Sequence, residues 1–272
     1  MNWLVIVPIL WAFQVESPQV KTGTVLVIDF SPDDLTVAAD SRMTFWDTGK
    51  HDDTVCKISA FGNKFVFAMS GTVFTDAGRN PNSIARQIWT TESRTEESAT
   101  KLVPAVAEKW TTRMEQFYAK SVQVGELRKH TRRAVLANAL FAATDSESRM
   151  AVVGVNMDFD ESLFDTYGQV RVTRDIQNVP IDSWVSVDLK QVAYEFRWET
   201  SDRAKKYMAR FRTEISALTP REQRAKLATK FVELSIRLHP RNAELGLPVD
   251  VLQLRPALGI NWVSLKSNCP QN

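Results

Sequence analysis

Residues that could together perform nucleophilic acyl transfer occur in order along the first third of the chain. They are Thr24, which follows Gly23 at the start of an apolar run, then Asp40, Lys57 and Gly71, each 14 to 17 residues after the one before. A hydroxyl nucleophile needs a base to activate it, and a backbone N–H can bind an oxyanion. Taken singly, each residue has an ordinary explanation, such as strand propensity for the threonine. Their order and spacing favour a site.

In that order, the chain resembles the proteasome β-subunit family of N-terminal-nucleophile (Ntn) hydrolases, which includes bacterial proteasome-like peptidases. The family pattern is Gly-Thr opening the first strand, then Ala-Ala-Asp-Ser-Arg, a lysine, and a small residue followed by Gly. This sequence contains GTVLVI, VAADSR, CKISAF and AMSG in the same order. The resemblance is sharp over residues 23–76, looser through the following helices, and returns in GLPVDVLQL.

The resemblance implies a threonine peptidase that is freed by autocleavage between Gly23 and Thr24. The new α-amine of Thr24 would be the base, because its reference pKa of about 7.7–8.0 suits neutral pH. The adjacent Thr22 is a competing nucleophile, but the spacing and the preceding glycine favour Thr24. The reaction would be amide hydrolysis through a threonyl ester, and no metal or organic cofactor is needed.

The other motif residues take supporting roles by the same resemblance. Lys57 would supply a positive charge that disfavours protonation of the amine and stabilises a deprotonated hydroxyl. Asp40 would hold Lys57, Arg42 would brace Asp40, and Gly71 would donate its N–H to the oxyanion.

Substrate preference would come from residues beside the nucleophile. By family position these are Met43, Thr44, Val55, Met69 and Val73. None is charged, so we predict a preference for apolar residues on the acyl side of the cleaved bond. The alternative is that these side chains belong to the core.

Two departures from the family pattern bear on activity. Aligning Gly246 with the family's late glycine puts Asn242 and Leu245 where an Asp and a Ser are usual. Thr200 or Ser201 could replace a further family Ser. The alternatives are therefore a non-catalytic scaffold or ring subunit that keeps its leader, and an amidohydrolase for small amides on the same fold.

The elements that must position these residues alternate in groups. Strands are expected near residues 25–30, 35–39, 55–61, 64–69, 136–144, 150–157, 184–189, 249–254 and 260–265, and helices near 84–93, 102–117, 202–217 and 220–238. Helix pairs between strand groups favour an α+β fold with antiparallel sheets. With the resemblance, this predicts a four-layer αββα sandwich. We expect a leader over residues 1–23, one domain over 24–265 and a C-terminal tail over 266–272.

The composition excludes several classes of function. The 34 Lys and Arg against 32 Asp and Glu give a net charge of +2 with no basic stripe, so a nucleic-acid partner is not expected. Three scattered His and two Cys do not form a metal-ligand pattern. Cys56 is expected as a buried thiol, with a bridge to Cys269 as the alternative in an oxidising compartment.

The N-terminal apolar run over residues 3–13 has the length of a signal-peptide core and is too short to span a membrane. Export is therefore slightly favoured over a cytoplasmic location, although no Lys or Arg precedes the run, and a packed propeptide is the alternative. The resemblance also implies peptide substrates and a homo-oligomeric ring. An ATPase partner would follow only for a cytosolic protein.

Overall fold

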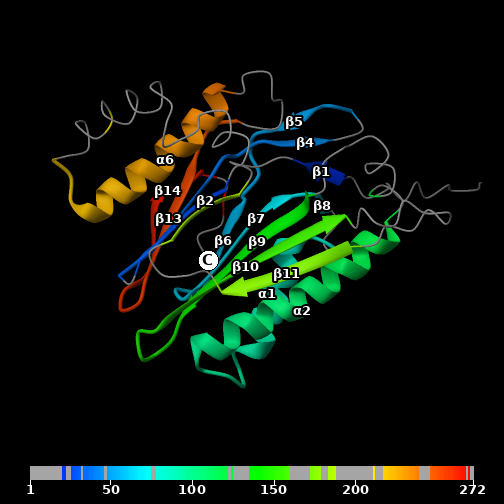
Figure 1. Cartoon of the computed structure of the whole chain (residues 1–272), viewed down its shortest axis with the longest axis horizontal. Coiled ribbons are helices and arrows are strands. Elements are labelled where there is room, and N and C mark those ends of the chain that lie inside the picture. The colour runs from blue at the N-terminus through cyan, green and yellow to red at the C-terminus, as the bar shows by residue number, and fades with distance from the viewer. Residues whose placement is uncertain are drawn as a thin grey trace, which may run out of the picture.

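The computed structural model describes the parts of the chain that form the central architecture (Figure 1). The described residues are 20–22, 26–31, 33–45, 48–74, 78–121, 124, 135–159, 172–178, 183–187, 211, 217–238, 246–267 and 269.

Two five-stranded antiparallel sheets carry most of the structure. Sheet I has the order β12 (Ser183–Val187), β2 (Leu26–Phe30), β3 (Leu35–Ala39), β13 (Asp250–Arg255) and β14 (Gly259–Ser264). Sheet II has the order β11 (Val172–Asn178), β10 (Met150–Phe159), β9 (Val135–Thr144), β7 (Phe65–Gly71) and β6 (Ile58–Phe61).

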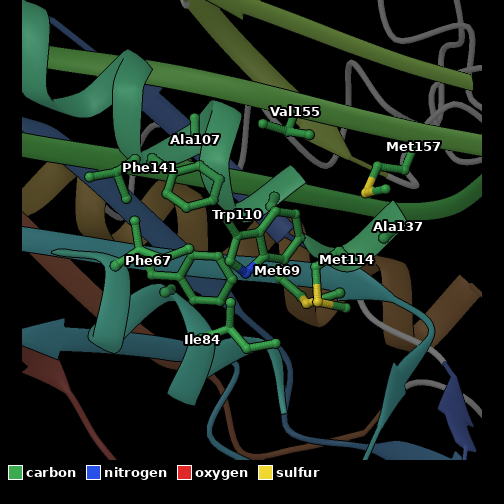
Figure 2. Packing of buried hydrophobic residues seen from close by; sticks show 14 of the residues in the cluster. Phe67, Met69, Ile84, Ala107, Trp110, Met114, Ala137, Phe141, Val155 and Met157 are labelled. Atoms are coloured by element: carbon green, nitrogen blue, oxygen red, sulfur yellow. The ribbon is translucent and has the colours of Figure 1, made fainter. Parts of the chain in front are cut away.

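Each sheet has helices against one face (Figure 1). The helices α1 (Pro81–Glu92) and α2 (Ala99–Lys120) cover sheet II, whereas α6 (Pro220–Leu238) covers sheet I. The Asn80 side chain caps α1 by accepting two backbone N–H groups, and Pro81 opens the first turn. One apolar face of α2 is buried, with Trp110 and Met114 packed against sheet II (Figure 2).

A second apolar layer lies between the sheets, which explains why β2 and β3 are buried along their whole length. Successive side chains of a strand point to opposite faces. Leu26 and Ile28 therefore pack with residues of sheet II, while Val27 packs with Ala228 and Val232 of α6. A strand buried on both faces reads as a continuous apolar run, as in VLVIDF.

A third, small sheet was not expected from the sequence. Its order is β5 (His51–Asp52), β4 (Met43–Phe45), β1 (Val20–Thr22) and β8 (Val73–Phe74). Residues 20–22, which we assigned to the leader, thus form a strand between two strands of the body. Strands this short are below the length at which periodicity is informative.

The broad part of the fold prediction is confirmed, because the protein mixes helices with antiparallel sheets. The helix expected at 220–238 has those bounds, and the expected strands match described strands to within a few residues, apart from 55–61, where β6 begins only at Ile58. The strand β11 was not predicted. The helix expected near 202–217 lies mostly outside the described residues. No helix in the described ranges is both long enough and apolar enough to cross a membrane.

Candidate active site

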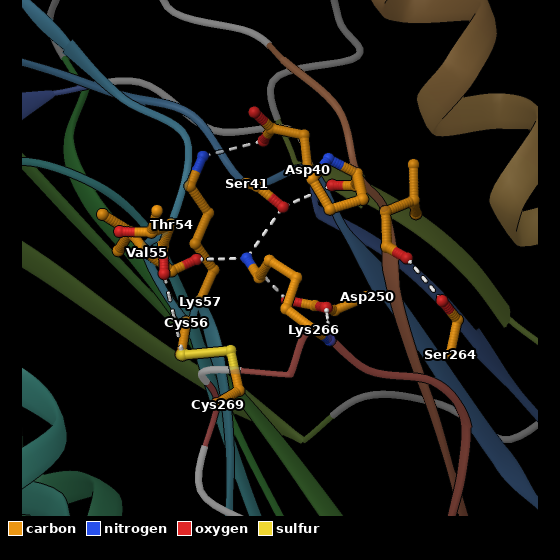
Figure 3. A network of polar contacts seen from close by, with 12 residues as sticks. Asp40, Ser41, Thr54, Val55, Cys56, Lys57, Asp250, Ser264, Lys266 and Cys269 are labelled. Atoms are coloured by element: carbon orange, nitrogen blue, oxygen red, sulfur yellow. Dashed lines mark hydrogen bonds and ion pairs between the residues drawn. A yellow bond between two sulfur atoms is a disulfide. The ribbon is translucent and has the colours of Figure 1, made fainter.

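A buried ion pair joins the two large sheets at the predicted site (Figure 3). Asp40 directly follows β3 of sheet I, and Lys57 directly precedes β6 of sheet II. Lys57 Nζ lies 2.8 Å from Asp40 Oδ1, and the two side chains are 1% and 0% exposed. The structure therefore brings together the lysine and the carboxylate that the sequence predicted as partners.

The second oxygen of Asp40 is also satisfied. Asp40 Oδ2 accepts the backbone N–H groups of Arg42 and Gly246, each at 3.1 Å. A buried ion pair is tolerated only when additional hydrogen bonds replace the lost hydration. The carboxylate of Asp40 thus accepts from Lys57 Nζ and from these two backbone N–H groups. These bonds hold the carboxylate in place and, through it, the ammonium group of Lys57. An ammonium group held in such a low-dielectric place can stabilise negative charge that develops on a nearby oxygen.

Arg42 contacts Asp40 through its backbone N–H, and its guanidinium has another hydrogen-bond partner. The guanidinium binds Asp53 through two bonds, Nε to Oδ1 at 2.5 Å and Nη2 to Oδ2 at 2.8 Å. The hydrogen bond to Asp53 raises the pKa of Arg42, and the same bond lowers the pKa of Asp53. The Arg42 side chain also lies close to Gly246, where an added Cβ would meet Arg42 Nε at 2.7 Å. The charge of Asp40 also contributes to raising the pKa of Arg42.

The lowered pKa of Asp53 predicts a small acid-dependent loss of stability. Asp53→Asn should lower the free energy of unfolding at pH 7 by less than ~1 kcal/mol, because the pair is partly exposed. A depressed carboxylate contributes fully above its unfolded pKa of about 3.9, and the contribution is lost as the pH falls through the lower folded value. Urea titrations of both proteins at pH 7 and about pH 2.5 measure this. A difference that widens on acidification would contradict it.

Gly71 lies at the end of β7 in a conformation that requires glycine. Its φ is +100°, and an added Cβ would lie 2.6 Å from the carbonyl oxygen of Leu136. The next residue is held on both sides: Thr72 N–H donates to Leu136 O at 2.8 Å, and the Tyr118 hydroxyl donates to Thr72 O at 2.6 Å. Tyr118 is fully buried in α2, and its burial raises its pKa. The predicted oxyanion glycine is thus built into a rigid turn.

The chain on either side of Thr24 lies against one segment of the body. Thr22, two residues before it, pairs with Thr44 of β4. Leu26, two residues after it, pairs with Ala39, the residue preceding Asp40. Two residues span at most about 7 Å. The described flanks of the predicted nucleophile are therefore both tied to residues 39–44.

The predicted substrate-contacting residues differ in their surroundings. Thr44 of β4 and Val73 of β8 pair with β1, opposite Thr22 and Lys21. Met69 is buried in the core under α2, and Val73 packs against that core. Met43 is buried in β4. Val55 is half-buried and lies two residues before Lys57.

Several predicted residues lie outside the described part of the chain. They are Gly23, Thr24, Thr200, Ser201, Asn242 and Leu245. Gly246, used to align two of them, is described, and it donates to Asp40 and accepts the Ser41 N–H at 3.0 Å. Among described residues no cluster of three or more His, Cys, Asp or Glu has the geometry of a metal site.

Sequence reasoning missed a second polar cluster beside the first. Lys266 contacts Ser41, Val55 and Asp250 (Figure 3). The expectation of a free thiol at Cys56 is wrong, because Cys56 forms a disulfide with Cys269. Ser41 lies within the VAADSR motif, so the sequence offered a signal from which it could have been predicted as a site residue. Lys266 carries no local signal, because its partners are far away in the sequence.

The arrangement of sheets and helices is distantly similar to that of a proteasome-like protein. The chain is similar to a solved structure of Anbu from Hyphomicrobium sp. strain MC1, a Gly-1 mutant, with a TM-score of 0.51 and 12% identity over 91% of this chain and 90% of that chain. Anbu is a bacterial proteasome-like protein of the Ntn-hydrolase fold. No protein-family model matches the sequence, and no curated protein matches it. At this identity the similarity concerns the fold alone.

Proposed function

We propose that this protein is a proteasome-like threonine peptidase whose nucleophile is Thr24, freed by cleavage after Gly23. The observation that carries the proposal is the buried Lys57–Asp40 pair, lying beside the segment to which both flanks of Thr24 are tied. Such a pair provides the cation that activation of a threonine hydroxyl requires. The Anbu-like fold supports the same class.

The proposed reaction uses groups of this chain alone. Thr24 Oγ adds to the carbonyl carbon of the substrate while its proton passes to the Thr24 α-amine, and the Gly71 N–H binds the oxyanion. The C–N bond then breaks, and the leaving amine takes the proton. Water hydrolyses the resulting threonyl ester and releases the acyl fragment as a carboxylic acid. Lys57 favours the neutral amine and stabilises negative charge on Oγ.

The third sheet supports peptides as substrates. Strand β1 is antiparallel to both β4 and β8, so those two strands lie roughly 10 Å apart with one strand between them. Removing β1 by cleavage would expose the facing backbone edges of β4 and β8. An extended peptide can pair with such edges by strand addition, with residues such as Thr44 and Val73 beside it. The leader would then occupy the place of a substrate before cleavage.

The proposal includes the finer architecture. Sheets I and II pack face to face through one apolar layer, and the helices α1 and α2 on one side and α6 on the other cover them. We assign these layers to the four-layer αββα sandwich of Ntn hydrolases, with the proposed site at the end of β3 and the start of β6. A homo-oligomeric ring is part of the same proposal, and native mass spectrometry tests it.

Cleavage at Gly23–Thr24 is the decisive prediction. Purified full-length protein should lose residues 1–23 and begin at Thr24, because the hydroxyl attacks the preceding carbonyl and water releases the leader. Intact mass and N-terminal sequencing measure this. Thr24→Ala should remain uncut at this bond, whereas Thr22→Ala, which removes the competing hydroxyl, should still be cut.

One observation favours the scaffold alternative. Strand β1 has partners on both sides, an arrangement that also suits a leader kept permanently in place. A chain that begins near residues 14–20 and stays uncut at Gly23–Thr24 would reject the peptidase. It would favour a non-catalytic subunit whose leader completes the third sheet.

A further inference from the structure

The residues after β14 lie beside the Asp40–Lys57 pair (Figure 3). The Lys266 side chain is only 5% exposed, and Cys269 is 6% exposed. The Cys269 N–H donates to Lys266 O at 3.1 Å, so the two residues form one turn. We call Lys266 and Cys269 together the C-terminal strap.

Lys266 connects the segments that carry the two members of the pair. Its Nζ donates to Ser41 Oγ at 2.7 Å, next to Asp40, and to the carbonyl oxygen of Val55 at 2.5 Å, two residues before Lys57. Its charge is balanced by Asp250, whose Oδ2 lies 2.8 Å away. One buried ammonium therefore links the end of β3 in sheet I to the entry of β6 in sheet II.

The disulfide holds the same segment from the other end of the strap. Cys56, immediately before Lys57, is bonded to Cys269, with the two Cα atoms 5.7 Å apart. The Cys56 carbonyl also accepts the Asn82 side-chain amide at 3.4 Å. Residues 55 and 56 are thus fixed by Lys266 and Cys269 at consecutive positions. A displacement of this segment would carry Lys57 with it.

We propose that Lys266 is a positioning residue for the Asp40–Lys57 pair, and that the Cys56–Cys269 disulfide keeps it in place, so that the site is fully assembled only in the oxidised chain. This inference rests on the proposed function. Disulfides persist in oxidising compartments, so the protein would become fully active after export and lose activity in a reducing one.

The switch requires only thiol–disulfide exchange. A dithiol reductant transfers two electrons and two protons to the Cys56–Cys269 bond, giving two thiols, and is itself oxidised to a disulfide. Cys269 is then held only by non-covalent contacts. Lys266 loses its tether, and its contacts with Val55 and Ser41 no longer have to form together.

Peptide hydrolysis by the processed enzyme, with and without dithiothreitol, tests the proposal. Reduction should lower kcat about 10-fold while KM stays within about 2-fold. The reason is that the surroundings of the nucleophile change, whereas the edges of β4 and β8 proposed to bind the peptide do not. A displaced Lys57 should also move the acid limb of the kcat/KM profile upward by about one pH unit. The described charges around this site are Asp40, Lys57, Asp250 and Lys266, with the Arg42–Asp53 pair nearby. A loss of folded protein would lower the profile without moving it.

Matched variants separate the strap from general effects of reduction. Cys269→Ser should be slow with or without dithiothreitol. Lys266→Met should be slow in both states although its disulfide still forms, as intact mass after alkylation will show. Lys64→Met, which removes an exposed lysine, should behave as wild type. The proposal would be overturned if the wild type is active and neither reduction nor Cys269→Ser changes its kcat or the pH dependence of its kcat/KM.

A second measurement does not depend on catalysis. In Thr24→Ala, amide hydrogen exchange over residues 55–58 should accelerate at least several-fold on reduction, with exchange in α2 unchanged as the internal control. If oxidised wild-type protein neither cleaves itself nor hydrolyses peptides, the proposed function fails, and this measurement still judges the strap. If reduction leaves hydrogen exchange at residues 55–58 unchanged, the proposed role of the C-terminal strap is wrong, whatever the outcome for the peptidase.

Discussion

Lys57→Met is expected to abolish the appearance of a Thr24 N-terminus and to lower the free energy of unfolding by about 3–5 kcal/mol. The loss of stability follows because Asp40 would remain as a buried carboxylate without its cation, with both side chains almost wholly inaccessible in the intact pair. The loss of processing follows because the charge that activates the hydroxyl is gone. Denaturant titration and intact mass measure the two effects separately.

A double variant distinguishes chemistry from folding. Asp40→Asn combined with Lys57→Met removes both charges, and replacing a buried pair with neutral groups is often close to neutral in stability. The double variant should therefore recover most of the stability lost by Lys57→Met but should still not be processed. Lys64→Met, at an exposed position, is the matched control. Processing in the double variant would contradict a chemical role for Lys57.

Gly71→Ala is expected to lower the free energy of unfolding by about 4 kcal/mol and to prevent processing. Two effects add: a φ of +100° strains any L side chain, and the new Cβ would meet two backbone atoms, Leu136 O at 2.6 Å and Ala137 Cα at 2.8 Å. Backbone of the paired strand β9 cannot move aside without breaking the β7–β9 ladder. Thermal or urea unfolding measures the loss.

Gly62→Ala provides the matched control for strain without a clash. Gly62 lies in the turn between β6 and β7, just before the start of the strand that Gly71 ends. Its φ is +62°, and nothing lies within 4 Å of its added Cβ. This variant should lose only about 1–2 kcal/mol and should process normally. Equal losses for the two variants would show that the close approach of β9 to Gly71 is not the cause.

Local patterns were sufficient to predict most of the large elements. A stretch such as residues 220–238 carries a helical apolar period over several turns, and a short β-branched run such as VLVIDF, followed by the turn residues Ser31 to Asp34, is typical of a buried strand. The motifs that carry Asp40, Lys57 and Gly71 resemble those of a known family, and that resemblance predicted that the first two residues would meet.

Partner choice at the site was decided by tertiary structure. Arg42 had Asp40 as a neighbour in the sequence, yet its guanidinium binds both oxygens of Asp53, while the oxygens of Asp40 accept from Lys57 and from two backbone N–H groups. The leader segment at residues 20–22 showed no strand pattern, and it forms a strand because β4 and β8 offer backbone partners on both sides.

The sequence by itself thus determined most of the strands and helices, because hydrophobic periodicity is written in neighbouring residues, and the family resemblance of its motifs predicted the lysine–carboxylate pair. Only the tertiary structure decided what surrounds that pair. Lys266 meets Val55 across 211 positions, and Cys269 meets Cys56 across 213. Contacts between residues so far apart leave no periodic or compositional trace, since they arise from how the sheets pack and not from the segments that supply them.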